Sequence, residues 1–353
     1  MKLERQFFLD LAARGVRMPV GTDMVLREKP GHAEILRDAT RLGKVVEESA
    51  RRWNTPLAIP LMDLTLEKDL MLTCMGIPPE EVAEYQFRQP PPGGMVAALE
   101  EGLEKPFGPR LKAQVEAVGY IAHKTDLVPC GMVIGPFSLV AKTFAETIPA
   151  VFASASGDTA EDSEEVKALE DLLELGTRVI LRSVNAQIRA GAKVIVVAEP
   201  AASVAYFSPR QLEAGSDTFD RYVLAFNRRI TEKLAKAGVQ LFFHCCGELV
   251  DPYVGKFASL NPVILSLGSS RALWKDSALV PKDIVLYGNM PTKKFLLEEL
   301  TVKEVERLAA EIVQKMRETG HPHILGSECD VLSVPGREKI IMEKVWAFLK
   351  VAA

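Results

Sequence analysis

The sequence predicts an α/β fold of the (β/α)₈ TIM-barrel type, and three observations lead to this prediction. Short, nearly all-apolar segments alternate along the chain with longer segments of helical periodicity. Seven apolar segments are present, and their composition suits strands that are buried on both faces of a parallel sheet. No G-x-G-x-x-G motif follows the first of them, although an open doubly wound sheet would favour one. The barrel is therefore preferred, and the open sheet is the alternative.

The predicted strands are short and rich in Val, Ile, Leu and Phe. In chain order they are residues 56–61, 131–134, 193–198, 240–243, 263–267, 284–287 and 323–325. A strand, a helix and a parallel strand in succession require a crossover connection, which is right-handed in nearly all known proteins. Seven predicted strands in 353 residues fit a (β/α)₈ barrel with additional N-terminal helices better than an open sheet.

The helices between these strands have clear boundaries in the sequence. Apolar stripes at helical spacing run over residues 169–184 and 219–234. Thr301 and Glu304 form the capping-box pattern T-x-x-E, and Gly320 follows the end of the helix that this pattern begins. The sequence therefore predicts long helices that cover the outside of the sheet.

The chain is expected to form a single domain over residues 1–353, with an N-terminal helical extension over about residues 1–52. Two segments are rich in loop-forming residues, the proline-rich 88–94 and the acidic 154–165. Neither is long enough to separate two independent domains. Additional N-terminal helices are therefore expected beside the barrel.

Composition excludes several classes of function. Against 47 acidic residues there are 43 lysines and arginines, so the net charge is −4, which does not favour binding to nucleic acid or to an anionic membrane. No apolar run approaches the roughly 20 residues of a transmembrane helix, and the first residues lack the apolar core of a secretory signal. The five cysteines are too scattered for a disulfide framework. A cytoplasmic protein is expected.

A histidine and two cysteines lie at the C-terminal ends of two predicted strands. His244 and Cys246 follow strand 240–243, and Cys329 follows strand 323–325 through a Gly-Ser-Glu segment. A barrel places its active site at these strand ends. In an extended segment His244 and Cys246 point to the same side, because they are two residues apart. One imidazole and two thiolates form a known zinc environment, whose fourth position can stay open for a substrate atom or a carboxylate.

Packing in the core is the alternative interpretation of these residue types. Spacing alone favours it over zinc, since the sequence has no C-x-x-C pair. Cys245 is expected to point away from its two neighbours into packing, and Cys74 and Cys130 are also predicted to be core residues. His321 and His323 flank a proline just before the last predicted strand, and structural roles are predicted for both.

Two carboxylates and an aromatic residue follow other predicted strands and are expected to border the same pocket. Glu199 directly follows a wholly apolar strand, so we predict a catalytic and substrate-binding role, as the displaceable fourth zinc ligand or a partner of the ligands. Asp63 is predicted to combine a catalytic and substrate-binding role in the pocket with capping of the next helix. Phe137 is predicted to form a wall of the pocket, while Ser138 caps a helix.

Six segments resemble, in order along most of the chain, motifs of the uroporphyrinogen decarboxylase superfamily and particularly of its methyltransferase branch. They are MDLTLEKDLMLTCMG, GPFSLV, AEPAAS, HCCG, GNMPTKKFLLEELTVKEV and SECDVLSVPGREKI. HCCG resembles the H-x-C-G zinc motif, and the last segment resembles the element that supplies the final zinc cysteine. Glu199 stands where aspartate is usual. The resemblance implies a barrel with Zn²⁺ bound by His244, Cys246 and Cys329.

Two branches of the superfamily differ in their substrate-binding residues and in whether they require a metal. Uroporphyrinogen decarboxylases use an arginine-rich segment near the N-terminus to hold the substrate carboxylates, and they need no metal. The corresponding residues 55–65, TPLAIPLMDLT, contain no arginine. A tetrapyrrole with many carboxylates requires a cationic cleft, so this absence disfavours the decarboxylase.

The resemblance thus implies a zinc-dependent methyltransferase whose partner is a separate corrinoid (cobalamin) protein. The methyl group would move between cobalt and a small substrate, either a methoxylated aromatic donor or a thiol acceptor. Glu328 and residues 335–337 depart from the branch pattern beside the last cysteine, which favours the demethylating direction. A metal-free decarboxylase is the alternative, and a binding protein with a closed structural zinc site is a third interpretation.

Overall fold

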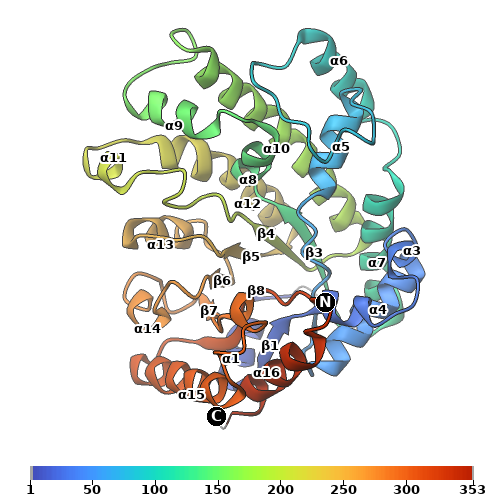
Figure 1. The fold of residues 1–353 in the computed structure, drawn as a ribbon, viewed down its shortest axis with the longest axis vertical. Coiled ribbons are helices and arrows are strands. Elements are labelled where there is room, and N and C mark those ends of the chain that lie inside the picture. The colour runs from blue at the N-terminus through green and yellow to red at the C-terminus, as the bar shows by residue number, and fades with distance from the viewer. Residues whose placement is uncertain (1–2, 352–353) are drawn as a thin grey trace.

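The computed structural model describes residues 3–351 and contains eight parallel strands in one curled sheet with helices around it (Figure 1). The hydrogen-bonded order is β1-β8-β7-β6-β5-β4-β3-β2, which is the order of a TIM barrel. The strand bounds are β1 Arg17–Val20, β2 Leu57–Ala58, β3 Val128–Ile134, β4 Val194–Ala198, β5 Gln240–Cys245, β6 Ile264–Leu267, β7 Val285–Tyr287 and β8 His323–Asp330. The predicted fold class is confirmed.

Strand β1 was not among the strands predicted from the sequence, whereas each of the other seven coincides with a predicted segment. It lies within the N-terminal stretch that was expected to be helical, and that stretch also holds α1 to α4. The strand is only four residues long and contains Pro19, which cannot donate a backbone hydrogen bond. Proline is tolerated there because β1 lies at one end of the hydrogen-bonded order and pairs with β8 alone.

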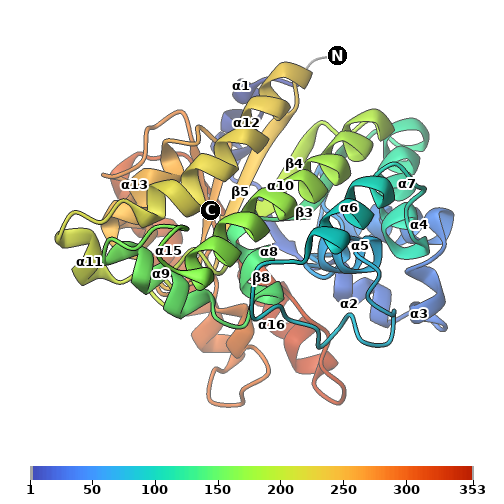
Figure 2. The same cartoon turned by 90° about the horizontal axis from the view of Figure 1, so that it is seen from above.

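Helices connect the strands and cover the outer face of the sheet. Their bounds are α1 Arg5–Ala13, α2 Thr22–Arg27, α3 His32–Ile35, α4 Ala39–Arg52, α5 Leu66–Cys74, α6 Gly93–Gly102, α7 Pro109–Lys124, α8 Pro136–Thr143, α9 Thr147–Ala155, α10 Glu164–Ala190, α11 Pro209–Glu213, η1 Asp220–Leu224, α12 Ala225–Ala237, α13 Asp251–Ala258, α14 Leu273–Asp276, η2 Thr292–Lys294, α15 Val302–Thr319 and α16 Glu338–Lys350. Figure 2 shows α4 to α7 on one side of the molecule and α13 and α15 on the other. No helix within residues 3–351 combines the length and apolar character needed to cross a membrane.

The boundaries of the longest helices follow the local sequence. The Ser163 side chain accepts a hydrogen bond from the Val166 backbone at the start of α10, and Thr301 accepts one from Glu304 at the start of α15. Gly320 ends α15 in the left-handed conformation, with φ of 61°, which glycine adopts without steric cost. The capping pattern predicted at Thr301 is therefore confirmed.

The barrel interior is filled by apolar side chains from the strands, and α1 covers the N-terminal strand ends. Phe8 and Leu11 of α1 are buried in the same apolar cluster as Met18, Phe242 and Tyr287. The Arg5 guanidinium donates hydrogen bonds to the backbone carbonyls of Pro262 and Asp283, each two residues before the start of β6 or β7. One end of the barrel is thereby closed, which leaves the C-terminal strand ends for a functional site.

Candidate metal centre

Three potential metal ligands meet at the C-terminal ends of β5 and β8. One ligand atom each from His244, Cys246 and Cys329 lies within 4.8 Å of the other two. His244 lies in β5, Cys246 directly follows that strand, and Cys329 is the penultimate residue of β8. In the hydrogen-bonded order β7 and β6 separate the two strands, so the curl of the sheet brings these residues together.

The imidazole of His244 is oriented by the neighbouring strand. Only 3% of His244 is exposed. Its Nδ1 lies 2.8 Å from the hydroxyl of Ser266, which is the residue of β6 that pairs with His244 in the sheet. Nε2 is also buried and has no hydrogen-bond partner. When Nδ1 donates its proton to Ser266, Nε2 presents a lone pair, which is the tautomer that a metal ligand requires.

The two thiols influence each other strongly. Interaction with the Cys329 thiol lowers the pKa of Cys246, against the opposing effect of burial, and nearby His244 and Lys293 add to the lowering. The same interaction with Cys246, together with burial, raises the pKa of Cys329. The two thiols thus lie close together beside an unpartnered imidazole nitrogen. Two sulfur atoms and one nitrogen form a donor set that fits zinc.

Glu328 and Lys293 lie beside this group and were not predicted as site residues. The Glu328 carboxylate is buried and accepts hydrogen bonds from the backbone N–H groups of Ser269, after β6, and Lys293, after β7. The Lys293 ammonium donates to the backbone carbonyl of Cys246 at 3.5 Å. Glu328 directly precedes Cys329, and it thus connects that ligand to the loops after β6 and β7.

Glu199 is fully buried at the end of β4, and the N-terminus of α8 binds its carboxylate. Oε1 accepts from the Ser138 backbone at 2.6 Å, while Oε2 accepts from the Phe137 backbone at 3.4 Å and from the Asn227 amide at 2.9 Å. Burial raises the pKa of Glu199, and these donors oppose that effect. Glu199 is not part of the group of three clustered ligand atoms. These contacts position α8, and the predicted role of Glu199 as the fourth zinc ligand or as a partner of the ligands remains a prediction.

Phe137 and Asp63, the other two predicted site residues, both make contacts within the chain. Phe137 is completely buried, and its ring packs 4.6 Å from that of Phe207. Its predicted place in the wall of a substrate pocket remains a prediction. Asp63 accepts hydrogen bonds from the backbone and hydroxyl of Thr65 before α5, and it forms an ion pair with Arg110. The N-cap of α5 is Thr65, whose side chain makes no capping hydrogen bond, so Asp63 holds the turn before the helix and does not cap it as predicted. Its predicted contact with substrate remains a prediction.

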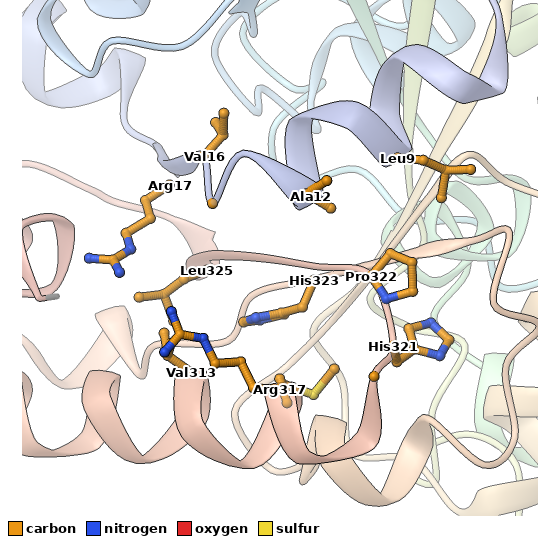
Figure 3. Close-up of a pocket in the computed structure, with 14 residues that line it drawn as sticks. Leu9, Ala12, Val16, Arg17, Val313, Arg317, His321, Pro322, His323 and Leu325 are labelled. Atoms are coloured by element: carbon orange, nitrogen blue, oxygen red, sulfur yellow. The ribbon is translucent and has the colours of Figure 1, made fainter. Parts of the chain in front are cut away.

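The other histidines near β8 lie away from the metal ligands. His321 and His323 line a cavity of about 270 Å³ between α1 and α15, at the N-terminal end of β8 (Figure 3). His321 Nε2 donates to the Ile284 carbonyl at 2.9 Å, and His323 Nε2 donates to the Gly288 carbonyl at 2.7 Å. Both imidazoles therefore hold neighbouring strands together, as the structural interpretation predicted.

His323 makes stability depend on pH. Burial lowers the pKa of His323 from 6.5 to about 4. The unfolded chain therefore binds a proton at mildly acidic pH that the folded chain excludes, and stability falls as the pH falls. We expect His323 to contribute a loss of about 2 kcal/mol in the free energy of unfolding between about pH 7 and about pH 5.

Urea unfolding of the wild type and of His323→Gln at both pH values measures this loss. The variant should show a smaller pH dependence, while His123→Gln, at an exposed position of α7, should match the wild type. An unchanged pH dependence in His323→Gln would contradict the assignment.

Asp330, at the end of β8, is another site-adjacent residue that sequence reasoning missed. Burial and the nearby Asp23 carboxylate raise the pKa of Asp330 to about 7. The sequence feature that indicates Asp330, Glu328 and Ser266 as site residues is their position at the C-terminal ends of strands. That signal is weak for β8, because the strand continues beyond the apolar segment that predicts it.

Comparison with known proteins places this geometry in a family. A family model described as uroporphyrinogen decarboxylase (URO-D) matches residues 18–340, from β1 into α16. The chain is similar in structure to a methyltransferase from Methanosarcina mazei, with a TM-score of 0.66 and 18% identity over 98% of each chain, a likeness that supports the fold. No curated protein matches the chain in sequence. Because the family match spans nearly the entire barrel, the chain belongs to the uroporphyrinogen decarboxylase (URO-D) family.

Proposed function

We propose that this chain is a zinc-dependent methyltransferase that exchanges a methyl group between a small substrate and the cobalt of a separate corrinoid protein. The observation that carries the proposal is the buried Nε2 of His244, which has no hydrogen-bond partner and belongs to the same cluster as two cysteines. An unpartnered buried nitrogen is costly unless a ligand satisfies it. The donor set supports zinc as that ligand.

The residues of the site have two roles, which are metal binding and orientation of a ligand. His244, Cys246 and Cys329 would bind zinc, and Ser266 would keep the imidazole in the required tautomer. When bound, zinc supplies a Lewis acid for the heteroatom of the methyl donor or acceptor. The chain contributes the orientation of the substrate at the strand ends, and the corrinoid contributes the reactive cobalt.

Exposed apolar side chains support an interaction with a protein partner. The large hydrophobic residues that remain exposed in the described part of the chain all follow the C-terminal end of a strand: Ile148 and Phe152 after β3, Leu296 and Leu297 after β7, and Leu332 after β8. Exposed apolar residues are used in protein interaction surfaces. A corrinoid protein docked there would present cobalt to the metal site.

The methyltransferase neighbour and the sequence motifs favour this branch over a metal-free decarboxylase. The neighbour is described as a methyltransferase, and the arginine-rich segment of the decarboxylases is absent from residues 55–65. We favour the demethylating direction, in which a methoxylated donor methylates cobalt, because the departures from the branch pattern lie beside Cys329. Glu328 is the departure that has a structural role in this chain.

We expect the zinc-loaded protein to change the absorbance of a corrinoid protein when a suitable substrate is present. Methoxylated aromatics are tested with the Co(I) form, and thiols are tested with the methylated form, because these species have distinct spectra. Cys246→Ser should abolish the change, whereas Cys74→Ser, on α5 and outside the cluster, should leave it intact. Loss of carbon dioxide from uroporphyrinogen without any change in cobalt would show that the proposal is wrong.

A further inference from the structure

The cavity between α1 and α15 contains two arginines. It has a volume of about 270 Å³ and lies at the N-terminal end of β8, at the opposite end of that strand from Cys329. Arg17 of β1 and Arg317 of α15 are two of the residues that line it (Figure 3). Burial and the positive charge of Arg317 lower the pKa of Arg17. The two cations therefore destabilise each other unless an anion lies between them.

No carboxylate group balances these arginines within residues 3–351. None of the ion pairs in that part of the chain includes either arginine. Neither aspartate nor glutamate is among the residues that line the cavity. The last turns of α1 and α15 contain one carboxylate each, Asp10 and Glu318, and each accepts a hydrogen bond from a glutamine of its own helix. Arg17 donates to the Leu349 carbonyl of α16, which is a neutral acceptor.

The remaining polar groups of the cavity offset only part of the positive charge. Burial lowers the pKa of His321 and of His323, so both imidazoles are neutral at pH 8. The C-terminal ends of α1 and α15 border the cavity, and each carries a partial negative charge of about half a unit. Together the two helix ends offset one of the two guanidinium charges at most. An excess of about one positive charge is therefore available to a ligand.

Apolar side chains form most of the remaining wall and suit the carbon skeleton of a small compound. They include Leu9 of α1, Val313 and Met316 of α15, and Leu325 of β8. Small-molecule sites typically have volumes of about 300–1,000 Å³, so this cavity is suited to a ligand at the lower end of that range. The oxygen atoms of a carboxylate or phosphate match the hydrogen-bonding geometry of guanidinium groups. Two cations beside an apolar wall thus favour an organic anion.

We propose that this cavity binds a small organic anion, whose carboxylate or phosphate group accepts hydrogen bonds from Arg17 and Arg317 while its apolar part lies against α1 and α15. The site is separate from the metal ligands, and the proposal does not depend on zinc or on methyl transfer. Because the two arginines come from distant parts of the chain, the anion joins β1 to α15. It stabilises the folded protein, since the unfolded chain does not form the site.

Titration calorimetry of the full chain at pH 8 tests this proposal with three probes. Valerate and valeramide have nearly the same shape and differ in charge, and butyl phosphate presents the other acidic group on a similar alkyl chain. We expect at least one of the two anions to bind about tenfold more tightly than valeramide, since a hydrogen bond to a charged group contributes at least that much. The anion that binds more tightly identifies the preferred acidic group. Equal binding of all three probes, or binding of none, would overturn the proposal.

Single substitutions locate the binding in this cavity. Arg317→Gln, at an exposed position of α15, should remove most of the preference for the anion, and Arg17→Gln should do the same. Arg317→Lys keeps the charge and should retain part of the preference. Arg14→Gln is the matched control, because Arg14 is an exposed arginine at the end of α1 that does not line the cavity. Circular dichroism checks that each variant is folded.

Cys246→Ser distinguishes this site from the metal centre, where an anion can bind to zinc. We expect anion binding to persist in Cys246→Ser and to weaken in both arginine-to-glutamine variants. Binding that is lost in Cys246→Ser and unchanged in Arg317→Gln would instead place the anion at the metal centre, and the proposal would be wrong.

Discussion

Replacement of both cysteines, Cys246→Ser with Cys329→Ser, is expected to abolish stoichiometric zinc binding while the barrel stays folded. The wild type should retain one zinc per chain after dialysis against metal-free buffer. Loss of a single residue that merely orients a ligand typically costs about 10–100-fold in metal affinity, so the loss of two thiolates should cost considerably more. Elemental analysis measures the zinc content, and circular dichroism checks that the helices remain.

Two further variants make this experiment specific to the cluster. Cys245→Ser changes the residue next to Cys246, yet the Cys245 thiol faces the Ala202 carbonyl at 3.7 Å and is not among the clustered ligand atoms. Zinc should therefore be retained in that variant. Ser266→Ala removes the partner of His244 Nδ1 and should weaken binding without abolishing it. Stoichiometric zinc in the double-serine variant would contradict the assignment of the metal site.

The fold was predictable because most strands have a strong local signal. Seven strands are buried apolar segments, and such segments stand out from the charged helices between them. The exception, β1, is formed by only four residues that include Pro19. Its stability comes from pairing with β8 and from packing of Met18 in the barrel interior, and neither contact has a signal within residues 17–20.

The candidate site was predictable where position along a strand was sufficient. His244, Cys246 and Cys329 follow recognisable strands, and the resemblance to family motifs placed them in one group. The contacts of Glu328 with Ser269 and Lys293 join loops that are 59 and 35 residues away in the chain. No periodicity or spacing reveals a contact of that kind, because it depends on how the sheet curls.

Glu199 and Phe137 show that a position at a strand end does not determine which way a side chain faces. Both directly follow or nearly follow strands, and both were expected to face the pocket. The structure instead joins them to each other, since the Phe137 backbone donates to the Glu199 carboxylate at the start of α8. A residue at a strand end can face the site or the adjacent βα turn, and the sequence does not distinguish the two directions.

This arrangement changes what Glu199→Gln is expected to do. Both carboxylate oxygens accept hydrogen bonds, and they come from the Ser138 and Phe137 backbones and from Asn227. In glutamine one oxygen becomes an NH₂ group, which cannot accept any of them. The Asn227 amide could turn its unpartnered Oδ1 toward that group, but Nδ2 would then lose its bond to the Val223 carbonyl. At least one buried donor or acceptor is left unsatisfied in either arrangement.

We therefore expect Glu199→Gln to lower the free energy of unfolding by about 2–4 kcal/mol, because unsatisfied buried groups and the loss of a charged acceptor add together. Gly135→Ala should also destabilise the fold, since a Cβ at Gly135 would overlap the Glu199 carboxylate. Urea unfolding measures both effects, with Glu213→Gln as the control at an exposed position of α11. The folded fraction of Glu199→Gln should retain its zinc, because His244, Cys246 and Cys329 are unchanged. A variant of normal stability that has lost zinc would instead identify Glu199 as a metal ligand.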